Sequence, residues 1–340
     1  MMATNLQEPF KAFVIDKGED GSLSSGLTTL HHAQLDAGEV TIKVAYSSVN
    51  YKDALAATGT GKIIHRFPCV GGIDVAGEVI QSSDARFAAG DKVLATAYNI
   101  GVSHHGGYAE YARLPADWLV PLPEGLNLLE AMALGTAGLT AALGIVHMET
   151  NGLTPEKGPV LVTGATGGVG SLAVDMLSGL GYEVTALTSK STEDAYLKGL
   201  GAAEVVSAST IDLSSVKAME EGRWAGAVDS VGGPLLSWVI ATMKRAGTIA
   251  CIGNAGSFKL NTTVYPFILR GVSLLGVDSG FIASPVRQQV WQRLRNDLKP
   301  KHLRECTQVI DFDELPKAFD RFVQGQVRGR TVVRIDDSLG

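Results

Sequence analysis

Four closely spaced glycines fall within segment 163–170, which reads TGATGGVG and directly follows the apolar residues 160–162. Gly164, Gly167, Gly168 and Gly170 separate a β-branched run from a stretch with helical apolar spacing, a pattern that predicts a strand, a tight turn and a helix. The N-terminus of such a helix can receive a pyrophosphate, because its first N–H groups have no partner within the helix. The sequence therefore predicts a dinucleotide site; the alternative is a tight turn without a ligand.

The residues that end the next strand predict which nicotinamide cofactor this site takes. A site for NAD needs a carboxylate about 20 residues past the first glycine, where it binds the ribose hydroxyls. This chain has Thr188, Ser189 and Lys190 there, so an acid is missing and a cation is present. Two hydroxyls and an ammonium group suit a ribose that carries a 2′-phosphate, and we expect NADPH. The alternative is that Lys190 is only a solvated charge before a helix.

The composition indicates a globular chain with no general affinity for polyanions. Of its 340 residues 45% are apolar, which is enough for two domains with separate cores. The formal net charge is -6 and no basic block is present, so we expect neither nucleic acid nor a membrane as partner. Three scattered cysteines suit a reducing compartment, residues 1–10 lack an apolar targeting segment, and we expect a cytoplasmic protein. The uncharged stretch 131–148 is interpreted as a buried helix.

Two styles of structure follow one another along the chain. Short runs punctuated by turns predict strands of a partly open β-barrel at 12–15, 40–46, 74–80, 92–97 and 108–114. Strands and helices then alternate, as in a doubly wound parallel sheet, with strands expected at 160–162, 183–187, 204–206, 227–229, 248–252 and 272–276. We therefore expect a first domain of residues 1–130 and 300–340, into which a nucleotide-binding domain of residues 131–299 is inserted.

Three helices have recognisable boundaries. Ser191, with Asp194 three residues on, has the pattern of an N-cap, and Gly201 would end that helix. A second helix is expected from Ser284, with apolar residues at four-residue spacing up to Leu298. An amphipathic helix over 313–325 and a strand over 331–335 are expected to return to the first domain.

Several segments together carry a resemblance to a known superfamily: SSVNYKD at 47–53, RFAAGDKV at 86–93, GTAGLTA at 135–141, PFILR at 266–270 and GVDS at 276–279. With the glycine run, their order and spacing resemble the medium-chain dehydrogenase/reductase superfamily, its zinc-free quinone oxidoreductase branch and the acrylyl-CoA reductase subgroup within that branch. The resemblance implies an α/β fold in which a Rossmann sheet is inserted into a GroES-like catalytic domain.

The same resemblance implies the residues of an active site. Asn50 and Tyr51 would approach the nicotinamide from the catalytic domain, and Tyr51 would either donate the proton or only pack against the ring. Thr166, Gly167, Gly168 and Val169 would hold the pyrophosphate. The remaining candidates line the far side or return from the C-terminal segment: Asn254, Ile268, Ser279 and Arg330. The alternatives are that Ile268 belongs to the core and that Arg330 is a structural ion-pair partner.

Metal is not expected. Zinc enzymes of the superfamily use a cysteine of the first domain and a GHE motif as ligands, whereas residues 71–74 here read GGID and no four-cysteine lobe follows. Cys69 has no partner in sequence, and the adjacent His104 and His105 point in different directions. Without zinc, hydride transfer to an activated double bond or a quinone is the natural chemistry.

The resemblance implies the reduction of acrylyl-CoA to propanoyl-CoA. The alternatives are a quinone reductase and a non-catalytic NADPH-binding protein. An acyl-CoA carries several negative charges, so a chain of net charge -6 needs a local group of cations, for which Lys52, Lys62, Arg66 and Arg270 are the candidates. Pairing of the strand near 274–276 with a second copy would make a homodimer.

Overall fold

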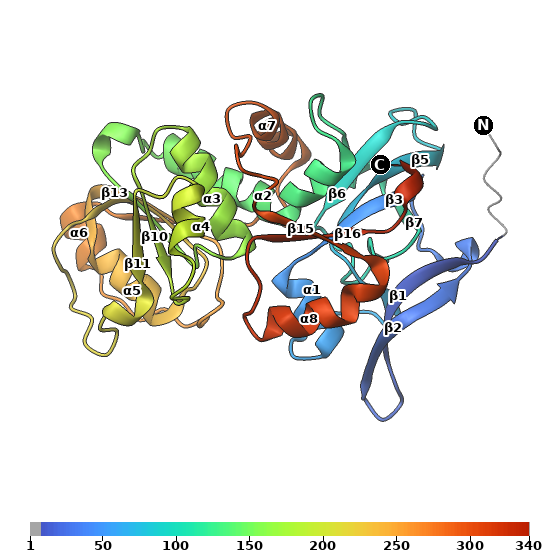
Figure 1. Cartoon of the computed structure of the whole chain (residues 1–340), viewed down its shortest axis with the longest axis horizontal. Coiled ribbons are helices and arrows are strands. Elements are labelled where there is room, and N and C mark those ends of the chain that lie inside the picture. The colour runs from blue at the N-terminus through green and yellow to red at the C-terminus, as the bar shows by residue number, and fades with distance from the viewer. Residues whose placement is uncertain (1–7, 340) are drawn as a thin grey trace. The chain divides into compact units, whose positions relative to one another are not determined.

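The computed structural model describes residues 8–339 and divides them into two compact units (Figure 1). The first contains the described residues up to Thr136, the segment Gly280–Gln288 and the residues from Thr307 on; the second contains Ala137–Ser279 and Gln289–Cys306. These bounds differ from the expected ones: 131–136 and 280–288 lie in the first unit instead of the nucleotide-binding one, and 300–306 lie in the second. The longest of these differences is the segment 280–288. This segment lies in the first unit because Arg287 is buried there and donates to the carbonyl oxygen of Thr96 at 3.0 Å.

The first unit is built on two sheets of mostly antiparallel strands. A three-stranded sheet has the order β2-β1-β4, and a larger one has the order β15-β16-β3-β5-β6-β8, with β7 pairing to β3. Neither order returns to its first strand, so the barrel is open, as expected. The strands are β1 Phe10–Lys17, β2 Leu23–Leu30, β3 Val40–Val49, β4 Cys69–Val70, β5 Asp74–Ser82, β6 Lys92–Thr96, β7 Tyr111–Leu114, β8 Val120–Pro121, β15 Thr307–Asp311 and β16 Arg330–Arg334.

Two helices close the core of this unit. The strand β3 leads directly into α1, Tyr51–Thr58, and the predicted amphipathic helix is α8, Leu315–Val323. Phe319 of α8 is buried, and its ring meets that of Phe13 at 5.3 Å between centroids. Ala54, Ala56 and Ala57 of α1 belong to the same apolar cluster as Phe319, so the helix that begins at the site described below is packed against the C-terminal segment.

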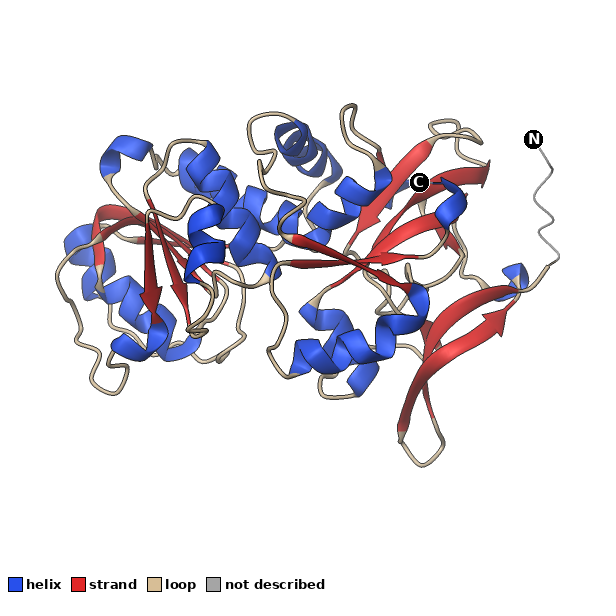
Figure 2. Ribbon diagram, in the orientation of Figure 1, coloured by secondary structure: helices blue, strands red, loops and turns tan. Residues whose placement is uncertain are grey.

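The second unit is a doubly wound parallel sheet with the order β11-β10-β9-β12-β13-β14, and helices lie on either side of it (Figure 2). The winding reverses between β9 and β12, and ligands of such sheets bind at that point of reversal. Its strands are β9 Val160–Thr163, β10 Val184–Thr188, β11 Glu204–Ser207, β12 Trp224–Asp229, β13 Met243–Cys251 and β14 Ser273–Gly276. Its helices are α3 Gly168–Gly179, α4 Asp194–Gly199, α5 Gly233–Ala241 and α6 Tyr265–Arg270. The predicted fold class is confirmed.

One predicted helix start is wrong. The helix α4 begins at Asp194 with Glu193 at its N-cap, not at Ser191. The Thr188 hydroxyl accepts a hydrogen bond from the N–H of Lys190 at 3.1 Å, and this local turn holds the chain out of helical conformation after β10.

Two further helices, α2 (Leu128–Thr150) and α7 (Ser284–Arg295), each contain residues of both units. By length and composition alone α2 could cross a membrane, but 78% of its most apolar window is buried inside the protein, so it is a core helix as predicted. It is interrupted at Gly135, whose backbone has φ 49° and ψ −152°. The helix α7 ends at Arg295, so Leu298 lies beyond it, although it is buried.

Candidate active site

The glycine run forms the predicted turn between β9 and α3. Gly164 has φ +59°, and a Cβ at Gly170 would lie 2.3 Å from the carbonyl oxygen of Gly164. Both positions therefore require glycine, the first for its backbone conformation and the second for the close approach of helix to turn. Gly167 is the N-cap of α3. The N-terminal N–H groups of a twelve-residue helix thus follow the end of β9 directly, which is the geometry that binds a phosphate.

A second turn at the end of β12, which the sequence analysis missed, is joined to the first. The buried Asp229 carboxylate accepts hydrogen bonds from the Thr163 hydroxyl at 2.6 Å and from the N–H of Gly232 at 2.8 Å. Burial raises the pKa of Asp229. The hydroxyl of Ser230, the residue after Asp229, is buried and, among the described residues, has no hydrogen-bond partner. The signal in the sequence was a second glycine pair, Gly232-Gly233, directly after a strand.

The residues predicted to select the cofactor lie at the same edge of the sheet. Thr188 ends β10, the neighbour of β9, and its side chain is buried. Ser189 is exposed and Lys190 is half-buried. The carboxyl ends of β9 and β10 therefore bring the glycine turn and the Thr188–Lys190 segment together, with hydroxyls and an ammonium group in place of a carboxylate.

The candidates for the far side of the cofactor site, Asn254, Ile268 and Ser279, differ in where they lie. Asn254 and Ser279 follow the carboxyl ends of β13 and β14, and the Ser279 hydroxyl pairs with that of Thr140 at 2.6 Å. Ile268 lies on α6 with 68% of its surface exposed, so the alternative that it belongs to the core is wrong. The cofactor roles of all three remain predictions.

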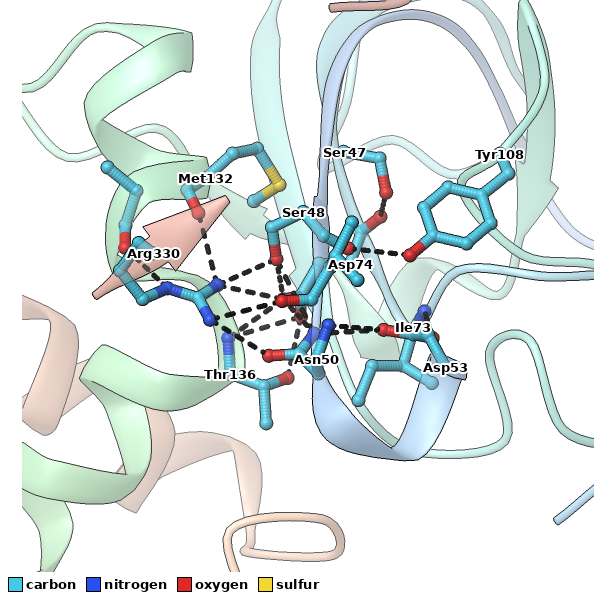
Figure 3. A network of polar contacts seen from close by, with 12 residues as sticks. Ser47, Ser48, Asn50, Asp53, Ile73, Asp74, Tyr108, Met132, Thr136 and Arg330 are labelled. Carbon is cyan, nitrogen blue, oxygen red and sulfur yellow. Dashed lines mark hydrogen bonds and ion pairs between the residues drawn. The ribbon is translucent and has the colours of Figure 1, made fainter. Parts of the chain in front are cut away.

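In the first unit Asn50 is held on every side (Figure 3). Its amide nitrogen donates to the carboxylates of Asp74 at 2.8 Å and Asp53 at 3.2 Å, and its amide oxygen accepts from the Arg330 guanidinium at 3.2 Å. Tyr51, the first residue of α1, is 46% exposed. Of the two, Tyr51 is the side chain that remains available to a ligand.

Arg330 begins β16 and is only 2% exposed. Its guanidinium donates to the carbonyl oxygen of Ala133 at 2.9 Å and to the Ser48 hydroxyl at 2.8 Å, in addition to Asn50. Burial lowers the pKa of Arg330, and the nearby carboxylate of Asp74, at 3.9 Å, opposes that effect. These contacts are the ones expected if Arg330 is a structural ion-pair partner. A direct role of Arg330 at the cofactor or substrate remains a prediction.

Two buried carboxylates complete this network, and the sequence analysis missed both. Asp74 is fully buried and accepts hydrogen bonds from Ser48, from Asn50 and from the N–H and hydroxyl of Thr136. Asp53 accepts the N–H of Asn50 at 2.8 Å. Burial, with the charge of Asp74 nearby, raises the pKa of Asp53 to about 7. By residue type alone, both acids are indistinguishable from surface residues.

The candidate metal ligands of the sequence do not fit a zinc ion. The buried Cys69 thiol faces the carbonyl oxygens of Val70 and His104. The ring nitrogens of His104 face carbonyl oxygens at 3.0 and 3.1 Å, and Nδ1 of His105 accepts the N–H of Val70 at 3.0 Å. Between residues 8 and 339 no three His, Cys, Asp or Glu side chains converge as a metal site would require.

Two of the four candidate cations have other partners. Arg66 forms an ion pair with Asp36. Arg270 donates to the carbonyl oxygens of Ala241 at 3.0 Å and Met243 at 2.8 Å, which ties α6 to the start of β13. Lys52 and Lys62 are exposed. Arg66 and Arg270 therefore have partners within the protein, and the role of all four cations at the substrate remains a prediction.

Comparison with known proteins agrees with this architecture. Residues 36–124 match the alcohol dehydrogenase GroES-like domain, and residues 168–296 match the zinc-binding dehydrogenase family. The chain is thus a member of the medium-chain dehydrogenase/reductase superfamily of oxidoreductases.

Three relatives cover almost the whole chain. The putative quinone oxidoreductase YhfP of Bacillus subtilis is 47% identical over 96% of this chain and 99% of its own. The acrylyl-CoA reductase AcuI of Ruegeria pomeroyi is 45% identical, again over 96% and 99%. The crystal structure of the Salmonella enterica YhdH oxidoreductase in complex with NADP superimposes with a TM-score of 0.93 at 45% identity, covering 96% of this chain and 100% of that one.

Proposed function

We propose that this protein reduces acrylyl-CoA, or a similarly small α,β-unsaturated acyl-CoA, with NADPH. The observation that carries the proposal is the 45% identity, over nearly the full length, to a chain named acrylyl-CoA reductase. In the reaction, a hydride adds to the β-carbon of the thioester and a proton to the α-carbon, which yields propanoyl-CoA.

The second unit supplies a fitting cofactor site. Gly164, Thr166, Gly167, Gly168 and Val169 would hold the pyrophosphate at the N-terminus of α3. Bound NADPH would supply the hydride. The Ser230 hydroxyl, buried without a partner in the described part of the chain, suits a cofactor group at the point where the sheet reverses its winding.

Thr188, Ser189 and Lys190 would bind the ribose and its 2′-phosphate. The absence of a carboxylate from the end of β10 supports NADPH over NADH. A solved structure of YhfP, 46% identical to this chain, has NAD bound, and kinetics with both cofactors tests the preference of this chain. Asn254, Ile268 and Ser279 are proposed contacts on the far side.

In the first unit we assign direct contact with the reacting groups to Tyr51. Its phenol would either donate the proton to the α-carbon or pack against the nicotinamide. Asn50 and Arg330, predicted as catalytic, are retained as residues of the site; in this structure they contact one another, and both lie next to Asp74.

One assay separates this proposal from its alternatives. NADPH oxidation is followed with acrylyl-CoA, with crotonyl-CoA and with a quinone. Turnover of the quinone alone would favour quinone reduction, which the name of YhfP supports. Turnover of none would favour a non-catalytic NADPH-binding protein.

We further propose that the chain forms a homodimer through β14. This strand is at the edge of the six-stranded sheet, and the preceding helix α6 exposes Tyr265, Ile268 and Leu269. An unpaired edge beside exposed apolar side chains is a template for pairing with a second copy. Sedimentation velocity of the wild type and of Leu269→Glu tests it, and a monomeric wild type would contradict it. The cytoplasmic location remains a prediction.

A further inference from the structure

The interruption of α2 at Gly135 leaves polar backbone groups that a continuous helix would satisfy. The carbonyl oxygens of Met132 and Ala133 lie before the break, and the N–H of Thr136 follows it. Arg330 donates to both carbonyl oxygens, at 3.4 and 2.9 Å, and Asp74 accepts from Thr136 at 3.1 Å. A cation at the end of one helical segment and an anion at the start of the next also oppose the charges of the two helix dipoles.

The same two charged residues meet at the amide of Asn50. Asp74 accepts from its nitrogen and Arg330 donates to its oxygen (Figure 3). The Asp53 carboxylate accepts hydrogen bonds from both the side-chain amide and the backbone N–H of Asn50. With charged groups of opposite sign on its two ends, the amide has one favourable orientation.

Asp53 lies within the first turn of α1 and ties that turn to a neighbouring segment. Its other carboxylate oxygen accepts the N–H of Ile73 at 3.0 Å, which joins α1 to the residue before β5. The turn that begins α1 is therefore attached to its surroundings at two points, through Asp53 to Ile73 and through Asn50 to Asp74. No hydrogen bond to the Tyr51 hydroxyl is found among residues 8–339, so the backbone of this turn sets where that ring stands.

We propose that Asp53 and Asp74 are positioning residues for the reduction, which act through Asn50 to hold Tyr51 at the first turn of α1. The inference rests on the proposed function, in which Tyr51 meets cofactor or substrate. Removing either carboxylate would release the Asn50 amide and let the Tyr51 ring move. A displacement of about 1 Å at a reacting group can lower turnover by ~100-fold.

A double-mutant cycle between Asp53→Asn and Tyr51→Ala tests the inference. The measured quantities are kcat and KM for acrylyl-CoA and the Kd for NADPH. We expect Asp53→Asn to lower kcat by about tenfold or more while KM and the Kd change by less than about twofold, since only alignment is lost. In the Tyr51→Ala background the same substitution should change kcat by less than about twofold, because the group that it positions is already gone.

Asp175→Asn is the matched control. Asp175 is a buried carboxylate of the second unit that accepts the N–H groups of Lys301 and His302, and we place it outside the site. Its variant should keep kcat within about twofold in both backgrounds. If Asp53→Asn fails to fold, Ser48→Ala replaces it, because Ser48 contacts both Asp74 and Arg330.

The inference would be overturned if Asp53→Asn lowered kcat by the same factor with and without Tyr51, or if Asp53→Asn kept the wild-type kcat. Failure of the proposed function gives a different result. A wild type that turns over only the quinone overturns the substrate assignment, and the cycle is then measured with the quinone. A wild type that fails to oxidise NADPH with acrylyl-CoA, crotonyl-CoA or the quinone overturns both.

Discussion

The Thr163 hydroxyl donates a 2.6 Å hydrogen bond to the Asp229 carboxylate, and this bond joins the carboxyl ends of β9 and β12. Both side chains are fully buried. The other oxygen of the same carboxylate accepts the N–H of Gly232, so one buried acid holds two glycine turns in register. These two strands are the neighbours between which the sheet reverses its winding, which is where the cofactor is proposed to bind.

Thr163→Val should destabilise the protein by about 1–3 kcal/mol, because it keeps the side-chain shape and leaves Asp229 buried with one donor fewer. Urea unfolding followed by circular dichroism measures the change. Ser230→Ala is the control: in the described part of the chain its hydroxyl has no partner to lose, so its effect should stay within about 0.5 kcal/mol. Equal losses in the two variants would contradict the role given to Thr163.

Lys190→Ala should weaken NADPH binding by about ten- to a hundredfold, the equivalent of a charge-assisted hydrogen bond of roughly 1.5–3 kcal/mol. NADH lacks the 2′-phosphate, so its binding should hardly change. Lys198→Ala is the control, because that exposed lysine pairs with Asp194 on the surface of α4. Steady-state kinetics with both cofactors measures the preference, and an NADH preference in the wild type would refute the assignment.

The pKa of Asp53, raised to about 7 by burial and by the charge of Asp74, should make stability depend on pH. The unfolded chain releases this proton near pH 4, so between about pH 4 and pH 7 the folded protein binds the additional proton. Stability contributed by this group is therefore present at low pH and is lost as pH rises through that window. Above about pH 7 the Asp53 carboxyl is ionised in both the folded and the unfolded chain, so it adds no further pH dependence.

Asp53→Asn removes this titration. The difference in free energy of unfolding between wild type and variant, followed by thermal unfolding from pH 4.5 to 8, should fall by a few kcal/mol and then level off. Other groups titrate in the same way in both proteins, so they cancel in the difference. If the difference in free energy of unfolding stays constant or grows as pH rises, the pKa of Asp53 is not raised in the folded protein.

The sequence predicted those features that depend on local pattern. The glycine turn at 164–170 follows from backbone conformation, and α8 follows from its apolar spacing. Ser191 had the right residue type for an N-cap, but the helix begins later, after a turn in which the Lys190 N–H donates to the Thr188 hydroxyl. Such local competition is not visible in a capping pattern.

The charged network could not be predicted, because its members are far apart in the chain. Whether Arg330 reaches a ligand or is buried depends on Ser48, Asn50 and Ala133, which only the folded strands bring to it. Asp53 and Asp74 are charged residues that become buried only because donors surround them. Ile268 is exposed at 68% although it is apolar, and the face of α6 on which it lies is not revealed by its residue type.

Dialysis against a strong chelator should leave both activity and melting temperature unchanged. The physical reason is the geometry around Cys69, His104 and His105, whose polar atoms face backbone groups. A protein treated in parallel with the metal-saturated chelator controls for the dialysis itself. Stoichiometric zinc by elemental analysis, or a fall in melting temperature that added zinc restores, would refute the zinc-free prediction.

The last prediction concerns the charged end of the substrate. The sequence suggested Lys62 and Arg66 together, but Arg66 pairs with Asp36, and its neutralisation would also leave that acid without its partner. Lys62→Ala alone is therefore the cleaner probe. It should raise the KM for acrylyl-CoA severalfold, because the phosphates of CoA lose an attractive charge, and the effect should shrink as salt rises. Turnover of a simple quinone, which has no phosphates, should not change.

Lys17→Ala is the control for Lys62→Ala, because Lys17 is an exposed lysine at the end of β1 that no candidate site includes. It removes the same net charge from the whole protein, so any effect that it shares with Lys62→Ala is long-range rather than local. If acrylyl-CoA and quinone lose equally in Lys62→Ala, the loop around Lys62 acts through cofactor binding or folding. The acyl-CoA assignment would then depend on similarity to AcuI alone.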